Sequence, residues 1–412
     1  MASGDLTLRS AAVVDPARES VTGDRRVRIR DGVIRAVEPE DGSSLGEGEI
    51  DASAGYLLPG LIDCHVHVIS ASASTTLQAD MYASFVAARA ARNMGEMLRR
   101  GFTTVRDAAG ADGGLAEAVE RGLILGPRLI YAGKALSQTG GHADIRPAGR
   151  ETHDPHYFVP TLGRICDGVD EVRRAARDEI RRGASHIKIM ASGGCASPTD
   201  RVDSLQFSQE ELEAIVEEAA AAGIYCAAHA YTADAVNRSL RAGVRTIEHG
   251  NLMDQTSVAL FRERSAFLVP TLITYSALVE NGAALGLSRF SLEKSRQVYD
   301  AGLASLEMAD RAGLRIAFGT DLLGDMQVRQ SEEFAIRARV QRPADVLRAA
   351  TTTAAELLRL EGRVGVVAPG AHGDVVLARH NPLDDISHLA DPERELVCVV
   401  KGGELVVDRR AA

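Results

Sequence analysis

The chain has 412 residues, of which 45% are hydrophobic, and its 47 lysines and arginines against 57 aspartates and glutamates give a formal net charge of −10. This acidic balance excludes a nucleic-acid backbone or an anionic membrane as the main partner, because there is no basic surplus to displace counterions. The start of the chain has no signal-peptide pattern, there is no run of about 18 apolar residues, and the five cysteines form no CxxC pair, so we expect a cytoplasmic protein with reduced thiols that acts on a small molecule.

The two ends of the chain have the texture of short β-strands. Residues 6–9 and 25–30 are of this kind, and Asp31-Gly32 is a typical hairpin turn. Strand-like runs return over the last 40 or so residues, with Lys401-Gly-Gly as a turn. Two isolated β fragments of about 50 residues would each be marginally stable. We therefore predict one small β-sandwich domain made from residues 1–55 and 362–412.

Between these ends, short apolar runs alternate with amphipathic helical patterns. The eight runs are Leu57–Val68, Thr103–Ala108, Arg128–Gly133, His186–Ser192, Tyr225–Ala230, Thr246–Gly250, Phe267–Leu272 and Arg315–Asp321. Ser208 and Glu211 have capping-box spacing and predict a helix that ends at Gly223, and a further helical stretch covers 343–360. The pattern predicts an α/β fold in which residues 56–361 form a closed parallel (β/α)8 TIM barrel.

The clearest chemical signal is His65-Val-His67 at the end of the first predicted barrel strand. Alternate side chains of a strand share a face, so both imidazoles can reach one metal ion. Four other predicted strands carry further ligand types at or near their ends. These are Lys188, His229, His249 and Asp321. Because the carboxyl ends of barrel strands meet at one mouth, the six side chains predict a two-metal site.

His186 lies two residues before Lys188 and one layer deeper, so we interpret it as a hydrogen-bonded core histidine. The remaining histidines lie in loop-like or terminal β sequence and are expected to be solvated; they are His153, His156, His372, His380 and His388.

The set of six predicted metal ligands resembles that of the amidohydrolase superfamily, in its branch with two metal ions. The resemblance covers nearly the whole chain, including the split β domain. It implies that His65, His67 and Asp321 hold one divalent ion, that His229 and His249 hold a second, and that Lys188, carboxylated by carbon dioxide, bridges the two. Zinc is the expected metal, although nitrogen and oxygen ligands also suit manganese, iron and cobalt.

The implied assignment is physically consistent. An ammonium group repels cations, so a lysine aimed at two metals requires a neutral or carbamate form. Two divalent ions activate water near neutral pH and polarise a carbonyl. Asp321, beside both, would accept the proton of the water and pass it to the leaving nitrogen. The chemistry is hydrolysis of an amide-type bond.

Within the superfamily the sequence resembles the prolidase-like group, which is close to imidazolonepropionase-related amidohydrolases and to ochratoxin-type amidases. The stretches that carry this likeness are 101–107, 140–142, 186–194 and 229–232. The resemblance implies that His142 contacts the scissile carbonyl oxygen and that Tyr231 binds the carboxylate of the substrate. His142 falls in a long Gly- and Pro-rich loop, 137–162, of the kind that forms substrate contacts at a barrel mouth.

The preferred substrate is expected to depend on the loop after the seventh strand, Thr271–Glu280. Its apolar start favours proline or another uncharged residue, which predicts an Xaa-Pro dipeptidase acting on dipeptides or N-acyl amino acids. Glu280 leaves a basic residue open, because one carboxylate can bind a cationic side chain.

Several alternatives remain open on the sequence alone. An ochratoxinase-like enzyme would remove aromatic or Arg/Lys residues from the carboxyl end. A ring hydrolase of the imidazolone type or a deaminase would need only one metal and no bridging lysine, and a non-enzymatic scaffold could lose its ligands. We expect a homo-oligomer.

Overall fold

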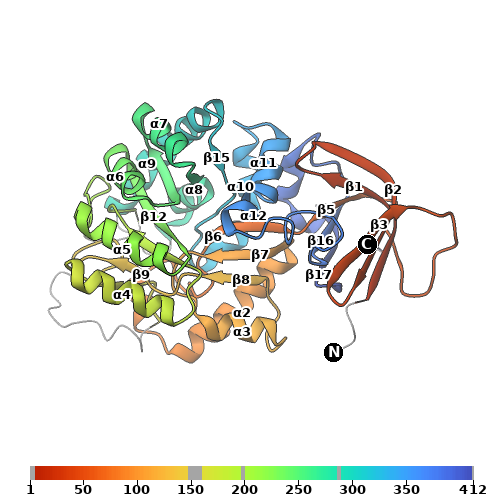
Figure 1. Cartoon of the computed structure of the whole chain (residues 1–412), viewed down its shortest axis with the longest axis horizontal. Helices are drawn as coiled ribbons and strands as arrows, with labels where there is room; N and C mark the ends of the chain where they lie inside the picture. Colours follow the sequence, from red (N-terminus) through yellow and green to blue (C-terminus); the bar gives the residue numbers. More distant parts are fainter. Residues whose placement is uncertain (1–4, 147–159, 196–199, 285–288, 411–412) are drawn as a thin grey trace.

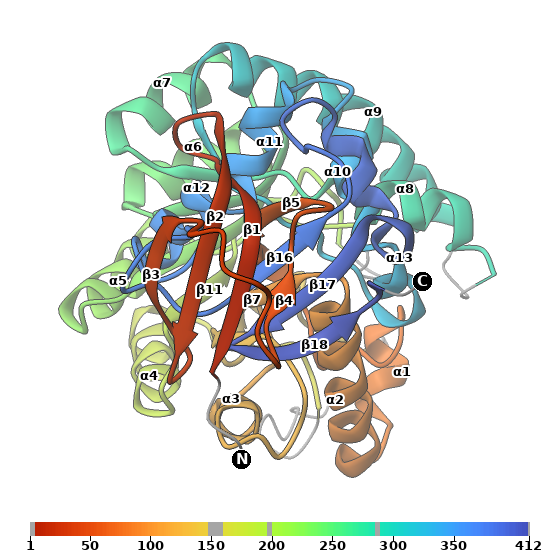
Figure 2. The ribbon, with the colours of Figure 1, turned by 90° about the vertical axis from the view of Figure 1, so that its right-hand side faces the viewer.

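The computed structural model describes residues 5–146, 160–195, 200–284 and 289–410. It has two parts that lie side by side, a helix-covered set of parallel strands and a smaller β-sheet (Figure 1). Strands from the beginning and from the end of the chain, red and blue in Figure 2, meet in the smaller sheet.

Hydrogen bonds join eight strands of the smaller part in the order β18-β17-β16-β5-β1-β2-β3, with β4 beside β1. The strands are β1 Leu6–Asp15, β2 Ser20–Arg30, β3 Val33–Pro39, β4 Ile50–Asp51, β5 Tyr56–Pro59, β16 Val375–Ala378, β17 Leu396–Lys401 and β18 Glu404–Asp408. The antiparallel pairing of β5 with β16 connects the two ends of the chain. The hydrogen bonds thus describe one sheet, where the sequence had suggested the two layers of a sandwich.

The central strand β16 is buried on both faces of this sheet. Val375 and Leu377 of β16 belong to an apolar cluster with Leu8 of β1. Val376, which points to the opposite face, packs in the cluster that contains Phe102 of the parallel strands. The small sheet is therefore fixed against the larger part by apolar contact.

The apolar run predicted as one strand over 57–68 is divided in the structure. Its first part is β5 of the small sheet, and its second part is β6, Leu61–Val66, of the parallel strands. At Gly60, between them, a Cβ atom would lie only 2.1 Å from Oγ1 of Thr103. The chain can pass from one part to the other here because glycine carries no side chain.

The larger part is built from parallel strands. They are β6, β7 Phe102–Asp107, β8 Arg128–Tyr131, β9 Ala135–Ser137, β10 Gly163–Ile165, β11 His186–Met190, β12 Tyr225–Thr232, β13 Thr246–Leu252, β14 Phe267–Val269 and β15 Arg315–Ile316. They form two ladders, β6-β7-β8 and β10-β9-β11-β12-β13-β14-β15.

Backbone hydrogen bonds outside the ladders connect the two into a ring. The N–H of Cys64 donates to the carbonyl of Phe318 at 2.8 Å, and the N–H of Ser185 donates to the carbonyl of Tyr131 at 2.9 Å. The third predicted strand, Arg128–Gly133, corresponds to β8. The chain then forms a further strand, β9, that was not predicted. Of the predicted eighth strand only Arg315–Ile316 is in a ladder.

Most of the helices surround the parallel strands (Figure 1), and the last helix of the chain packs against β17 of the small sheet. They are α1 Thr75–Ala79, α2 Ala83–Arg99, α3 Gly113–Glu120, α4 Val169–Arg181, α5 Gln209–Ala221, α6 Ala233–Ala242, α7 Gln255–Arg264, α8 Leu272–Asn281, α9 Arg289–Arg311, α10 Glu332–Arg337, α11 Pro343–Ala349, α12 Thr352–Leu358 and α13 Pro392–Glu395, with 3-10 helices η1 Gly324–Arg329 and η2 Ile386–Ala390. Among the described residues, no helix is both long enough and apolar enough to cross a bilayer.

The predicted capping box of α5 is confirmed, because Ser208 and Glu211 bond reciprocally. The expectation of a loop over 271–280 was wrong, since this segment is mostly α8. Leu272, Tyr275 and Leu278 are all buried and are spaced as on one face of a helix. The helical period was missed in the sequence because the first residues of the segment are apolar without a clear spacing.

Glu333 of α10 gives the fold a pH-dependent weak point. One of its carboxylate oxygens accepts the N–H of Ile273 at 2.7 Å, and the other has no hydrogen-bond partner among the described residues. Burial raises the pKa of Glu333 to about 8. The folded protein therefore holds a proton that the unfolded chain releases at about pH 4.3.

We predict that Glu333→Gln stabilises the protein by an amount that grows as the pH rises from 5 to 8. Between the unfolded and folded pKa values the wild type alone must keep a proton to stay folded, which costs up to about 1.4 kcal/mol per pH unit. Thermal denaturation at several pH values measures the difference. Glu332→Gln, at the exposed neighbouring position, is the control, and a difference that stays constant or shrinks with pH would contradict the assignment.

Candidate metal centre

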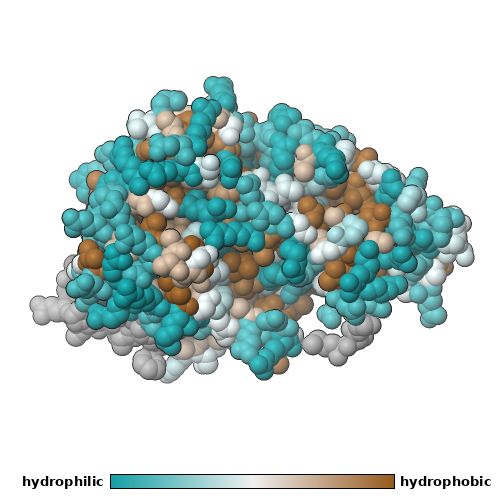
Figure 3. Space-filling model, viewed as in Figure 1, coloured by the Kyte–Doolittle hydropathy of each residue, from teal (hydrophilic) through white to brown (hydrophobic). Residues whose placement is uncertain are grey.

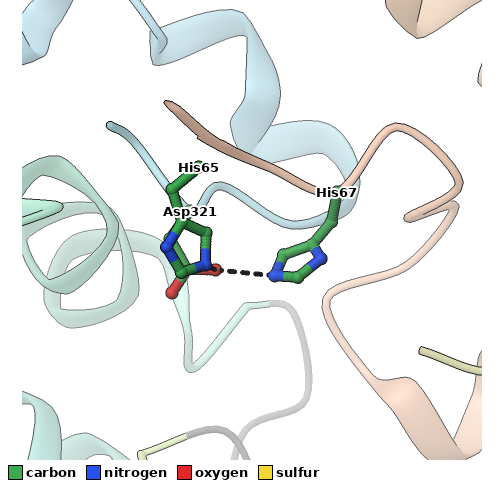
Figure 4. A group of neighbouring side chains, drawn as sticks. All are labelled: His65, His67 and Asp321. Atoms are coloured by element: carbon green, nitrogen blue, oxygen red, sulfur yellow. Dashed lines mark ion pairs between the residues drawn. The ribbon is translucent and has the colours of Figure 1, made fainter. Parts of the chain in front are cut away.

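His65, His67 and Asp321 come together at the carboxyl end of the parallel strands. Oδ1 of Asp321 lies 3.0 Å from Nε2 of His67 and 3.4 Å from Nε2 of His65. One ligand atom from each side chain lies within 4.8 Å of the others. Figure 4 shows the ring of His67 directed toward Asp321, which overlaps the ring of His65 in this view. The predicted first-metal ligands therefore form a group that can hold an ion.

The other predicted ligands lie beside this group. His229 comes from β12, His249 from β13 and Lys188 from β11, and all three line one cavity with His65, His67, Asp321 and His142. The ring centroids of His65 and His249 are 5.2 Å apart, and those of His229 and His249 are 4.6 Å apart. Seven of the eight predicted site residues thus share a cavity.

Three of the histidines have one ring nitrogen held by an acceptor outside the cavity. Nδ1 of His65 lies 2.6 Å from the carboxylate of Glu248, and Nδ1 of His67 lies 3.0 Å from the carbonyl of Ala109. Nε2 of His229 lies 3.2 Å from the carbonyl of Gly193. Since these oxygens only accept, each bonded nitrogen carries the proton and the other keeps its lone pair for a metal.

His249 follows the same rule through hydroxyl groups. Its Nδ1 lies 2.8 Å from both Oγ1 of Thr271 and the hydroxyl of Tyr275. Tyr275 donates its own proton to the hydroxyl of Tyr231 at 3.0 Å, so its oxygen can accept from His249. The ring of Tyr231 stacks on His249 at 5.0 Å, but Tyr231 does not itself line the cavity among the described residues.

Lys188 is the most unusual group at the centre. Its side chain is buried, and Nζ has no hydrogen-bond partner among the described residues. Burial lowers the pKa of Lys188 to about 8, and the carboxylates of Glu248 and Asp321 only partly oppose the shift. A buried amine without a partner, beside imidazole lone pairs and a carboxylate, fits a position that becomes a metal ligand after carboxylation.

Asp321 is held in its ionised form. Burial alone would raise the pKa of Asp321, but interactions with His65 and His67 outweigh it and hold the pKa well below its usual range. Its backbone has a positive φ of 55°, and that of His249 has 76°. In a regular strand, side chains point alternately to the two faces. The left-handed backbone at these two residues breaks this alternation at the positions where the side chains turn toward the cavity.

Sequence reasoning missed Glu248 and its partner Arg106. Arg106 donates to both oxygens of Glu248 at 2.8 and 2.9 Å, and neither side chain is exposed. Burial raises the pKa of Glu248, but the charges of Arg106 and Lys188 outweigh it and hold the pKa well below its usual range. The available signal was a carboxylate directly before His249, within a run predicted to be a buried barrel strand.

The environment of His142 contains a second missed carboxylate. Oδ2 of Asp200 lies 3.4 Å from Nδ1 of His142, and the amide side chain of Gln206 accepts the backbone N–H of His142 at 2.9 Å. Gln206 also donates to Asp200 at 3.1 Å. The ring of His142 stacks on His229 at 4.3 Å. Asp200 lies in a loop without a local motif, so no sequence signal marked it.

His186 is a core residue, as expected. It is fully buried, its Nδ1 lies 3.1 Å from the hydroxyl of Ser185, its ring stacks on Tyr225, and it does not line the cavity. His380 and His388 are exposed, whereas His372 is only partly so. His153 and His156 lie outside the described residues.

The comparisons with known proteins assign the family. A model of the amidohydrolase family matches residues 56–406, and the chain belongs to this family. A solved prolidase complexed with N-methylphosphonate-L-proline is 45% identical, with a TM-score of 0.94 over 98% of this chain and 100% of that one. A Xaa-Pro dipeptidase with bound methionine is 30% identical, with a TM-score of 0.86 over 97% of this chain and 99% of that one.

Another relative is named for a different activity. The ochratoxinase of Aspergillus niger is 36% identical over 363 residues, which are 85% of this chain and 75% of the relative. These likenesses support a hydrolase with a fold of the TIM-barrel type, and the resemblance inferred from the sequence is confirmed.

We predict that Lys188→Met removes metal from the protein and stabilises the metal-free form. Methionine fills a similar space but offers no carbamate, so the count of bound divalent ions falls from about two per chain toward one or none. It also removes the unsatisfied buried amine, so the metal-free variant melts at a higher temperature than metal-free wild type. Elemental analysis and thermal denaturation measure the two effects. Retention of the full metal content would contradict the assigned role.

Proposed function

We propose that this protein hydrolyses the amide bond of dipeptides or N-acyl amino acids whose carboxyl-terminal residue is proline or another uncharged residue. The observation that carries the proposal is the convergence of four histidines, Asp321 and Lys188 on one cavity, where the amine of Lys188 has no hydrogen-bond partner among the described residues. The prolidase complexed with N-methylphosphonate-L-proline, at 45% identity over nearly the whole of both chains, supports this substrate class.

The donor set fits two divalent ions, with zinc as the expected metal. His65, His67 and Asp321 would hold one ion, His229 and His249 the other, and carboxylated Lys188 would bridge them. When bound, such ions supply an activated water and a Lewis acid for the scissile carbonyl. Imidazole nitrogens with protonated opposite nitrogens and two carboxylate-type groups are ligands that zinc accepts.

Asp321 is suited to move the proton of the reaction. It is anionic, and its Oδ1 lies among the imidazoles that face the cavity. It accepts the proton of the attacking water and transfers it to the nitrogen of the broken bond, so that the amine leaves neutral.

His142 is suited to stabilise the oxygen of the scissile carbonyl. Its ring faces the same cavity beside His229, and Asp200 and Gln206 fix its orientation. A hydrogen bond from His142 to the developing oxyanion lowers the barrier because the donor is already in position.

The remaining cavity wall favours an uncharged substrate residue. It consists mainly of apolar side chains, among them Ile145, Leu162 and Leu323, and Asp321 is the only carboxylate among the described lining residues. Glu280, the alternative partner for a basic residue, is 55% exposed and pairs with Arg329 at 2.9 Å. These contacts support proline over arginine or lysine.

Tyr231 remains our candidate for the carboxylate of the substrate. Its ring packs against both His229 and His249, at 4.8 and 5.0 Å between centroids. Its hydroxyl accepts a hydrogen bond from Tyr275, and its own proton is the one that would be donated to the substrate carboxylate.

An ochratoxinase-like activity on aromatic residues is the second candidate, supported by the 36% identity to the Aspergillus niger enzyme. An apolar wall also accepts an aromatic ring. A ring hydrolase with one metal would leave Lys188 without a role, and a non-enzymatic scaffold would not need to keep all six ligand positions filled.

A panel of dipeptides tests the substrate class. We expect the metal-loaded enzyme to give its highest kcat/KM on Xaa-Pro, with lower values on Xaa-Phe and much lower values on Xaa-Arg. A highest value on Xaa-Phe or on N-acyl-phenylalanine would favour the ochratoxinase-like candidate. A preference for Xaa-Arg, or no cleavage of any member, would reject the proposal.

We predict that Asp200→Asn lowers kcat about tenfold or more while KM changes little, because it weakens the orientation of His142 in the transition state. In His142→Ala the same change has little additional effect, since the two residues act as one unit. Asp203→Asn, at an exposed position paired with Arg201, is the matched control. Additive losses in the double variant would contradict this coupling.

A further inference from the structure

A second cluster of metal-ligating side chains lies in the smaller part of the molecule. His380 follows β16, His388 belongs to η2, and Glu395 ends α13. One ligand atom from each lies within 4.8 Å of the others. None of the three lines the cavity of the metal centre.

The carboxylate of Glu395 gives this cluster a fixed base. Its side chain is 4% exposed, and its two oxygens accept the backbone N–H of His380 at 2.7 Å and contact Nδ1 of His380 at 2.8 Å. Two ligand atoms at this separation can both bind one ion with bonds of about 2.0–2.2 Å. The ion then takes the place of the hydrogen between the two groups, and the neutral imidazole keeps its one proton on Nε2, which is open to solvent.

The second imidazole is already beside the first. The rings of His380 and His388 are stacked, with centroids 4.3 Å apart and planes at 17°, so the exposed ring of His388 has to rotate out of the stack to direct a lone pair at an ion bound to His380. Nε2 of His388 also lies 3.8 Å from a carboxylate oxygen of Asp385, which adds negative charge next to the position of an ion.

The cluster is open to solvent on the histidine side. His380 is 58% exposed and His388 is 45% exposed, so an ion can enter without opening the core. Two imidazoles and one carboxylate, with water as a fourth ligand, form a tetrahedral set typical of zinc.

We propose that His380, His388 and Glu395 form a third metal site, separate from the metal centre, that binds Zn²⁺ reversibly from solution. The ion would connect three segments of the smaller part: the chain after β16, η2, and α13 with the start of β17. Because the site is assembled only in the folded chain, binding stabilises the native state.

Zinc titration of the enzyme with its metal centre already loaded tests this proposal. Calorimetry and elemental analysis should detect one further Zn²⁺ per wild-type chain, and added Zn²⁺ should raise the melting temperature. His388→Ala and His380→Ala should each weaken this uptake about tenfold or more and abolish the shift in melting temperature. Both residues are exposed, so neither change removes core packing.

His372→Ala is the matched control, because His372 lies in the same part of the chain and outside the cluster. It should bind the additional ion as wild type does. Dipeptide hydrolysis should be the same in all four proteins before zinc is added, which separates this site from the proposed function. Absence of further uptake by wild type, or full uptake by His388→Ala, would overturn the proposal.

Discussion

The amine of Lys188 lies inside the ring of parallel strands with no hydrogen-bond partner among the described residues. A buried donor left unsatisfied costs about 1–3 kcal/mol, and a charged one costs more. Its neighbours in the cavity are imidazoles whose other nitrogens are already bonded, together with the ionised Asp321. Cations in the space between these groups would pair with the free imidazole nitrogens and with Asp321, so the architecture around Lys188 fits a metal centre.

The buried ion pair of Arg106 and Glu248 stabilises this centre. Glu248 bonds the ring of His65, and Arg106 bonds both Glu248 and the carbonyl of Cys64 in the same strand as His65. Removing one partner of such a pair leaves an uncompensated charge in the core. The pair therefore connects the stability of the fold to the orientation of His65, a proposed metal ligand.

Features of the fold and of the candidate site that depend on short-range sequence patterns could be predicted from the sequence. The HxH motif, the residues that end the strands and the capping box at Ser208 could all be recognised from short spacings. Glu248 and Asp200 could not, because their roles arise from contacts with residues far away in the sequence. The break at Gly60 arises from a close approach to Thr103, which a run of apolar residues does not reveal.

We propose that two cations lie between the six side chains and share a carbamate on Lys188. Crystal diffraction at the absorption edge of the bound metal tests it most directly. We expect two anomalous peaks in the cavity and electron density for a carboxyl group continuous with Nζ of Lys188. A bare amine, with no peak beside the imidazoles of protein saturated with metal, would contradict it.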